Sequence, residues 1–275
     1  MPHEKRKNLL LGILSWVLAV LFLSPFYIVA TNSLKTQKGI FVGITSLPFG
    51  EYFSPSNYVE AFDKLDFIKS FFNSLIITGT STVVIIVFAS MAAWMLVRTR
   101  SKLSTGMYFM FAAAMLIPFQ SVMLPLINLM GKIGFLNPGG LIFMYLGFGS
   151  SLAIIMYHGF IKGIPVALEE AALIDGCNKF QIYWYIVLPL LKPITVTVSI
   201  LNVMWIWNDF LLPQLVINRP EWHTIPLKMF FFFGQFSKKW HLALAGLTIS
   251  MIPIIIFYFF AQKHIVKGIA QGSIK

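Results

Sequence analysis

The sequence contains few charged residues, very few acidic ones and a single cysteine. Of its 275 residues, 11% are charged and 57% are hydrophobic, whereas a soluble domain usually carries about 25% charged residues. Because so few charges cannot cover a water-solvated surface, part of the solvent around this chain must be lipid. Cys177 has no cysteine to pair with, which excludes an intrachain disulfide and a cysteine-rich metal site.

Motifs of catalysis are also missing from the sequence. No G-x-x-x-x-G-K-[ST] phosphate-binding loop occurs, so we do not expect this chain to hydrolyse ATP itself. The five histidines are far apart and lack the H-E-x-x-H pairing of a zinc site, and no serine lies in a G-x-S-x-G context. We therefore predict a chain that is not an enzyme and that holds no cofactor or metal of its own.

Acidic residues are outnumbered by basic ones, but the basic residues form no patch. The net charge of +11 comes from Lys and Arg residues scattered among the loops between apolar runs. A nucleic-acid partner needs a basic face, which this pattern does not provide. Basic loops between apolar runs are typical of a membrane protein with positively charged cytoplasmic loops.

Six apolar runs dominate the sequence, and each is long enough to cross roughly 30 Å of hydrocarbon at about 1.5 Å per residue. They cover residues 9–30, 71–97, 106–130, 139–161, 193–217 and 242–262, and Asp209 is the only acidic residue in them. In lipid each must be a helix, because no water is present to satisfy free backbone groups. The sequence predicts an all-α integral membrane protein with six transmembrane helices in a single domain, residues 1–275.

The loop charges predict the orientation. With the N-terminus inside, the cytoplasmic pieces are residues 1–8, 98–105, 162–192 and 263–275, which contain 12 Lys or Arg residues against nine in the outer pieces. This bias favours cytoplasmic termini at both ends of the chain. The first run is longer than the about 7–15 residues of a cleavable signal, so we expect an uncleaved anchor.

Residues 163–192, between the fourth and fifth runs, predict a helix, a turn and a second helix. Pro165 suits a first helical turn, and Gly176 supplies a left-handed stop. Asn178 and Gln181 have the spacing of a capping box for the second helix. We expect Pro189 and Pro193 to kink that helix as it enters the fifth span. The product is a short helical element at the cytoplasmic membrane surface, which is either an ordinary interfacial loop or a docking element with a small-residue face.

The same segment carries a resemblance to a known family. Glu170-Ala171-Ala172, three residues, Gly176, nine residues and Ile186-Val187-Leu188-Pro189 together read E-A-A-x3-G-x9-I-x-L-P. This pattern resembles the EAA signature of bacterial ABC-importer permeases. One departure is Cys177, where the family usually has an alanine. Residues 33–36, 207–213 and 267–275 are similar to the carbohydrate-uptake branch, and within it to the MalG-like permease subunits of maltose-type systems.

This resemblance implies a type I (MetI-like) permease fold in the bacterial inner membrane, with residues 163–192 forming a cytoplasmic coupling loop. It implies a second, MalF-like permease subunit, an ATPase dimer that binds ATP and Mg²⁺, an extracytoplasmic solute-binding protein, and a carbohydrate substrate, with an oligosaccharide expected. The residues implied to couple the chain to the ATPase are Glu170, Ala171, Ala172, Asp175, Gly176, Ile186, Leu188 and Pro189.

The fifth run offers a possible translocation path. Ser199, Asn202, Trp205 and Asp209 recur every three or four residues and therefore share one helical face. A carboxylate within a span normally faces a cavity or a partner. The face either lines a sugar route or joins neighbouring helices through hydrogen bonds, and the sequence leaves both interpretations open.

Two other classes of function remain to be compared with an importer subunit. A secondary sugar transporter driven by an ion gradient is disfavoured, because intramembrane charge is limited to Asp209 and no inverted repeat is visible. A polytopic membrane enzyme would show clustered His, Asp or Glu residues near one membrane face, and the sequence shows none. Co-purification with an ATPase would separate the importer subunit from both alternatives.

Overall fold

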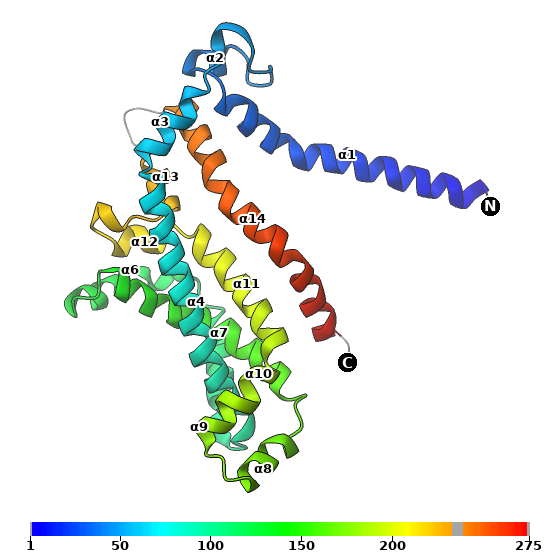
Figure 1. Ribbon diagram of the computed structural model, residues 1–275, viewed down its shortest axis with the longest axis vertical. Coiled ribbons are helices and arrows are strands. Elements are labelled where there is room, and N and C mark those ends of the chain that lie inside the picture. The colour runs from blue at the N-terminus through cyan, green and yellow to red at the C-terminus, as the bar shows by residue number, and fades with distance from the viewer. Residues whose placement is uncertain (1, 233–238, 274–275) are drawn as a thin grey trace. The chain divides into compact units, whose positions relative to one another are not determined.

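The computed structural model describes the backbone of residues 2–232 and 239–273 and the side chains of residues 7–230 and 239–263. Within these residues the fold is helical and contains no strand, and one isolated β-bridge pairs Lys35 with Phe53 (Figure 1). The predicted all-α class is confirmed.

Among the described residues, four helices are long and apolar enough to cross a membrane. They are α1 (Pro2–Ser33), α4 (Phe67–Arg98), α7 (Pro138–Ile161) and α14 (Trp240–Ser273). Two bent pairs pass the same test together: α5 (Lys102–Ala114) with α6 (Phe119–Lys132), bent by 105°, and Lys179–Leu190 with α11 (Lys192–Asn208), bent by 78°. The described chain therefore has four to six candidate spans, and six membrane crossings stay a prediction.

The remaining elements are short and connect or cap the long helices. They are α2 (Gln37–Val42), η1 (Gly50–Tyr52), α3 (Ser56–Lys64), α8 (Ala167–Ile174), α9 (Lys179–Ile182), the π-helix η2 (Tyr183–Val187), α10 (Leu188–Leu190), α12 (Leu211–Val216), η3 (Pro220–Trp222) and α13 (Ile225–Phe232).

The third predicted span, residues 106–130, is not one straight helix. α5 ends at Ala114, and Pro118 stands with extended backbone at the N-cap of α6. A proline lacks the N–H that a continuous helix needs and disfavours helical backbone in the residue before it, so the helix breaks here. The 13 residues of α5 extend about 20 Å, which is less than the hydrocarbon thickness.

The fifth predicted span, residues 193–217, also breaks, in this case at Asp209. Its backbone is extended (φ −75°, ψ 130°) at the end of α11. The Asp209 carboxylate accepts a hydrogen bond from the backbone N–H of Leu211 (3.0 Å), just before the short helix α12. A side chain that satisfies a free backbone N–H two residues ahead stabilises such a turn.

The chain divides into two compact units, a first unit of residues 1–67 and 228–252 and a second unit of residues 68–227 and 253–275. That both act as a single permease domain stays a prediction.

In the first unit, the segment after α1 is organised around the buried side chain of Lys35, which is 1% exposed. Its ammonium group donates hydrogen bonds to Asn32 Oδ1 (3.1 Å), the Gly43 carbonyl (2.7 Å) and Ser46 Oγ (3.2 Å). Asn57 donates to the Lys35 carbonyl (2.8 Å). Burial lowers the pKa of the Lys35 amine. Residues 33–36, which resemble the carbohydrate-uptake branch, therefore lie at the centre of this folded segment.

The second unit is built around α7, which contacts α5, α11 and α12. Tyr145 and Tyr157 of α7 are fully buried. Gly149 permits the close approach of α7 to its neighbours, because a β-carbon there would lie 2.5 Å from Ile85 Cδ1 and 2.8 Å from Asn202 Oδ1. Small residues at such crossings are typical of helix packing in membranes.

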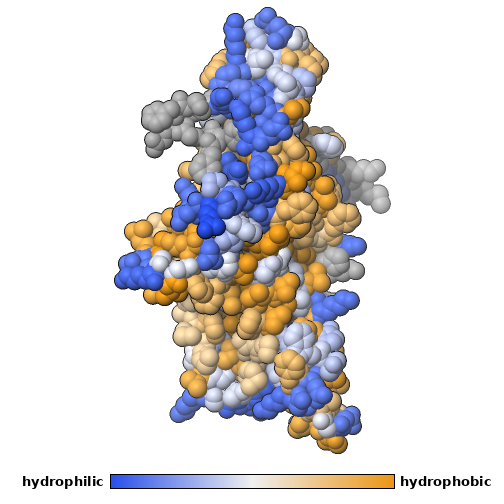
Figure 2. All heavy atoms as spheres, turned by 60° about the vertical axis from the view of Figure 1, so that its left-hand side comes forward, coloured by the Kyte–Doolittle hydropathy of each residue, from blue (hydrophilic) through white to orange (hydrophobic). Residues whose placement is uncertain are grey.

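The outer surface of the second unit has the polarity of a membrane protein. Figure 2 shows apolar side chains over the middle of its helices and hydrophilic side chains gathered at the end that carries α8 and α9. Large apolar side chains such as Phe72, Phe88 and Phe143 are more than half exposed. An exposed apolar surface of this kind indicates contact with lipid or with a partner.

Candidate functional site

The segment between α7 and α11 begins with α8, whose two faces differ. Glu169 and Ala172, three residues apart, are buried on its inner face. The opposite face is exposed, and Ile174 on it is 86% exposed. This outward face consists of Ala167, Glu170, Ala171 and Ile174, which recur at helical spacing. Of the two alanines in the EAA pattern, only Ala171 therefore lies on the exposed surface.

The end of α8 has the geometry that the sequence predicts. Gly176 has a φ of +87°. Its N–H donates to the Leu173 carbonyl (3.1 Å), and the N–H of Cys177 donates to the Ala172 carbonyl (3.0 Å). These two bonds form a Schellman motif, in which glycine takes the left-handed position without the strain that a β-carbon adds. Asp175, the C-cap residue, is exposed beside it.

The second helical stretch begins with the predicted capping box. The Asn178 side chain accepts from the N–H of Gln181 (2.9 Å), and the Gln181 side chain accepts from the N–H of Asn178 (2.8 Å). A π-helical turn, η2, then precedes Pro189. Widening the helix accommodates a proline ring, which would otherwise meet the carbonyl four residues earlier. Ile186 and Leu188 are half-buried, whereas Pro189 is exposed.

An ion pair and a ring hydrogen bond tie α8 to the end of α4. The Glu169 carboxylate accepts from Trp94 Nε1 (2.9 Å) and from Arg98 Nε (2.9 Å). The Arg98 guanidinium also lies 2.7 Å from the same carboxylate through its second nitrogen and donates to the Ile164 carbonyl (3.1 Å). Charge-assisted bonds of this kind, held away from water, are stronger than neutral ones.

A second contact joins the π-helix to α4. The hydroxyls of Tyr183 and Ser90 lie 2.7 Å apart, and both side chains are buried. The Tyr183 ring lies 5.8 Å from the Trp94 ring, measured between centroids. We call Ser90, Trp94, Arg98, Glu169 and Tyr183 the α4 anchor. It fixes both helical stretches of the loop to one long helix.

The sequence alone does not reveal the α4 anchor. In the sequence, Arg98 counts only as one of the positive charges of a predicted cytoplasmic loop. No pattern links it with Glu169, which lies 71 residues further along the chain. The helical spacing of Glu169 and Ala172 shows only that these two residues share a face. It does not show that this face, and not the one with Glu170, is the buried one.

The four predicted path residues of the fifth run separate into two groups. Trp205 and Asp209 line a cavity of ≈ 460 Å³, whereas Ser199 and Asn202 do not. The cavity is mostly apolar and aromatic, with a few polar groups. Its lining includes Phe119, Phe148, Gln120 and Asn208.

The hydrogen bonds of the two groups differ as well. Ser199 and Asn202 each donate to a carbonyl one turn earlier in α11 (2.6 and 2.9 Å). Asp209 instead accepts from the Tyr145 hydroxyl of α7 (2.9 Å), and the Tyr145 ring meets the Trp205 ring edge-on at 5.5 Å. Asn202 therefore packs between helices, while Trp205 and Asp209 combine a packing contact with a place at the cavity wall.

The described part of the chain brings no three His, Cys, Asp or Glu residues together in a way that could hold a metal ion.

Residues 85–271 match the family described as the binding-protein-dependent transport system inner membrane component. The chain belongs to this family. The matched range contains the whole loop between α7 and α11, the α4 anchor and the cavity at Trp205. This inner-membrane component is therefore a transport permease subunit.

Two relatives align with nearly the whole length of this chain. It is 51% identical over 266 residues, 97% of this chain and 96% of the relative, to a probable starch degradation products transport system permease of Thermoanaerobacterium thermosulfurigenes. It is 33% identical over 97% of its length, and 96% of the relative, to a melibiose/raffinose/stachyose import permease of Bacillus subtilis (strain 168).

A solved structure shares the fold of this permease subunit. A chain of a bacterial ABC transporter involved in the import of the acidic polysaccharide alginate superposes with a TM-score of 0.78 at 24% identity, covering 96% of this chain and 98% of that one. This likeness confirms the predicted permease fold.

Proposed function

We propose that this chain is a permease subunit for the import of neutral oligosaccharides, of the kind that starch degradation releases. The observation that carries the proposal is the 51% identity, over 97% of the chain, with a relative described as a starch degradation products permease. The relative described as importing melibiose, raffinose and stachyose supports the same substrate class, because these are also short neutral sugars.

The cavity at the end of α11 fits such a substrate. Sugars offer apolar ring faces and many hydroxyls, and ligand sites combine aromatic walls with a few placed polar groups. Trp205, Phe119 and Phe148 supply aromatic surface, while Gln120 and Asp209 supply groups that hydrogen-bond hydroxyls. We propose that substrate passes through or beside this cavity.

The loop between α7 and α11 is the proposed contact with the ATPase. The outward face of α8 presents Ala171, the Glu170 carboxylate and the exposed side chain of Ile174, which suits a groove with a basic rim. Its inner face is held by the α4 anchor, and its chain continues through α9 and α10 into α11. A displacement of α8 would therefore reach two long helices, directly through α11 and through the ion pair to α4.

The assembly that we propose contains a second, MalF-like permease subunit, two ATPase subunits and an extracytoplasmic solute-binding protein. ATP and Mg²⁺ bind to the ATPase and not to this chain. Both termini and the coupling loop face the cytoplasm, so residues 31–70 lie outside. This assembly is supported by a bacterial alginate ABC transporter, one chain of which has the same fold (TM-score 0.64), whose structure is a complex with an alginate pentasaccharide-bound periplasmic protein.

The test is to reconstitute this chain in proteoliposomes together with its second permease subunit, its ATPase and its solute-binding protein. We expect an affinity-tagged copy of this chain to co-purify with an ATPase, and ATP-dependent uptake of radiolabelled maltooligosaccharides only when the binding protein is present. A monosaccharide and an acidic oligosaccharide serve as substrate controls. Uptake driven by an ion gradient without ATP, or purification without any ATPase, would contradict the proposal.

A further inference from the structure

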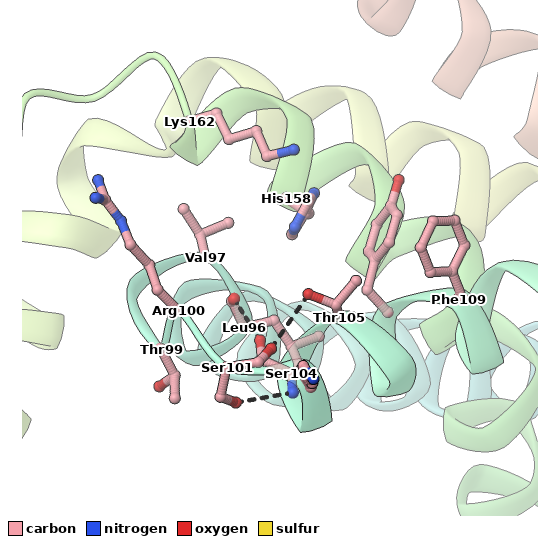
Figure 3. A pocket seen from close by; sticks show the side chains of 12 residues that line it. Leu96, Val97, Thr99, Arg100, Ser101, Ser104, Thr105, Phe109, His158 and Lys162 are labelled. Carbon is pink, nitrogen blue, oxygen red and sulfur yellow. Dashed lines mark hydrogen bonds between the residues drawn. The ribbon is translucent and has the colours of Figure 1, made fainter.

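A second cavity, of ≈ 650 Å³, lies between the α4–α5 turn and the end of α7. Figure 3 shows Arg100 on one side of it and Lys162 on another, with His158 between Lys162 and Thr105. Lys102, at the first position of α5, also lines it. The cavity therefore gathers three permanent cations from two segments that are about 60 residues apart in the chain.

These three cations have no anionic partner within the described residues. Arg98, just before them, is paired with Glu169, but Arg100, Lys102 and Lys162 form no ion pair in that part of the chain. The lining of the cavity contains no carboxylate. Like charges around one hollow repel each other, and an anion bound among them would relieve this repulsion.

The cavity is amphipathic as well as basic. Leu96, Val97 and Phe109 line it together with the cations, and Phe109 is 63% exposed. It also lies where apolar helices end, since α4 ends at Arg98 and α7 at Ile161. A ligand that fits must combine an anionic head with apolar surface and must reach the boundary of the membrane.

We propose that this cavity binds the phosphate headgroup of an anionic phospholipid. Arg100, Lys102 and Lys162 would contact the phosphate, because guanidinium and ammonium groups form charge-assisted hydrogen bonds with it. Phe109 and its apolar neighbours would contact the upper part of an acyl chain. Basic pockets between membrane helices are known to hold such headgroups. Inorganic phosphate shares the head chemistry but makes no use of the apolar wall.

The experiment places the complete transporter in nanodiscs made of equal amounts of phosphatidylglycerol and phosphatidylcholine. The transporter is then released from the nanodiscs, and native mass spectrometry measures which lipid it retains. We expect wild type to retain phosphatidylglycerol selectively. The variant Lys102→Gln/Lys162→Gln should reduce that selective retention roughly 25-fold, since each of the two basic residues contributes roughly fivefold to binding near an anionic surface. The matched control Lys192→Gln/Lys263→Gln removes the same charge from exposed positions outside the cavity and should retain the lipid.

Three outcomes would overturn the proposal. Equal loss in the control would show that overall charge and not the cavity holds the lipid. Unchanged retention in Lys102→Gln/Lys162→Gln would place the lipid elsewhere. If wild type in pure phosphatidylcholine discs retained inorganic phosphate as well as it retains phosphatidylglycerol, and the same variant lost it, the cavity would be assigned to free phosphate. Because the readout is bound lipid, none of these outcomes depends on which sugar is imported.

Discussion

The Arg98 guanidinium lies 2.7 Å from the Glu169 carboxylate and joins the end of α4 to the inner face of α8. Both side chains are largely shielded from water, with 17% and 11% of their surface exposed. Trp94 donates to the second carboxylate oxygen, so that both oxygens of Glu169 are held. This geometry fixes the position of the outward face of α8 relative to the membrane helix.

We expect Glu169→Gln to weaken the anchor without changing the size of the side chain. The carboxylate would no longer balance Arg98, and the free energy of unfolding should fall by about 1–3 kcal/mol. Thermal unfolding of the purified transporter in detergent measures this change, and ATPase stimulation by sugar-loaded binding protein measures coupling, which we also expect to fall.

Glu170→Gln is the matched control for this anchor, because Glu170 is exposed one position along the same helix. It should change stability by less than about 0.5 kcal/mol. The double variant Arg98→Met/Glu169→Met, with both single variants, gives the coupling energy of the pair. A coupling energy of zero would mean that the ion pair does not hold α8.

Gly176→Val should displace α8 without unfolding the spans. The β-carbon would meet no atom within 4 Å, so the only penalty is the left-handed backbone, which costs about 1–2 kcal/mol. We expect normal membrane insertion, lost sugar uptake and lost stimulation of the ATPase in proteoliposomes. Gly176→Asn should stay close to wild type, since asparagine tolerates this conformation. Wild-type coupling in the valine variant would show that α8 is not the coupling element.

Trp205→Ala should lower uptake by about an order of magnitude, the effect of losing an aromatic contact of roughly 1–1.5 kcal/mol. Assembly with the ATPase should remain, because Trp205 lies far along the chain from α8. Tyr145→Phe separates packing from transport, since it removes the bond to Asp209 while Tyr145 itself does not line the cavity. We expect this variant to lose stability and to keep its substrate preference. Normal uptake by Trp205→Ala would mean that this face of α11 only packs against neighbouring helices and does not line a sugar route.

Gly149→Ala should destabilise the packing of α7 against α4 and α11. The added methyl would meet Ile85 and Asn202 at less than 3 Å, and overpacking of this kind costs about 1–3 kcal/mol. Gly147→Ala and Gly159→Ala in the same helix are controls, because nothing lies within 4 Å of a β-carbon at either position. Midpoints of thermal unfolding in detergent should fall for Gly149→Ala alone.

Cysteine labelling tests the orientation. In a Cys177→Ala background, an impermeant thiol reagent should label cysteines introduced at Glu60 and Lys239 in intact cells. Cysteines at Lys102 and Lys263 should react only after the membrane is opened, because the loop charges place both inside. Labelling of position 102 from outside would reverse the orientation.

Several local features of this protein follow from residues close together in the sequence. The left-handed turn at Gly176 and the capping box of Asn178 and Gln181 agree with the structure, because each depends on backbone chemistry within four residues. The breaks near Pro118 and at Asp209 lie inside runs that the sequence predicts as single spans, since apolar composition alone does not distinguish a straight helix from a broken one.

The sequence by itself determined the family, the apolar runs and the caps of the coupling loop. Only the tertiary structure decided that Glu169 faces inward toward Arg98 while Glu170 faces outward, and that Trp205 lines a cavity while Asn202 packs between helices. The physical reason is the range of the interactions. Caps and turns are fixed by neighbouring residues, whereas an ion pair across 71 residues and a cavity wall exist only once the helices that carry them have packed.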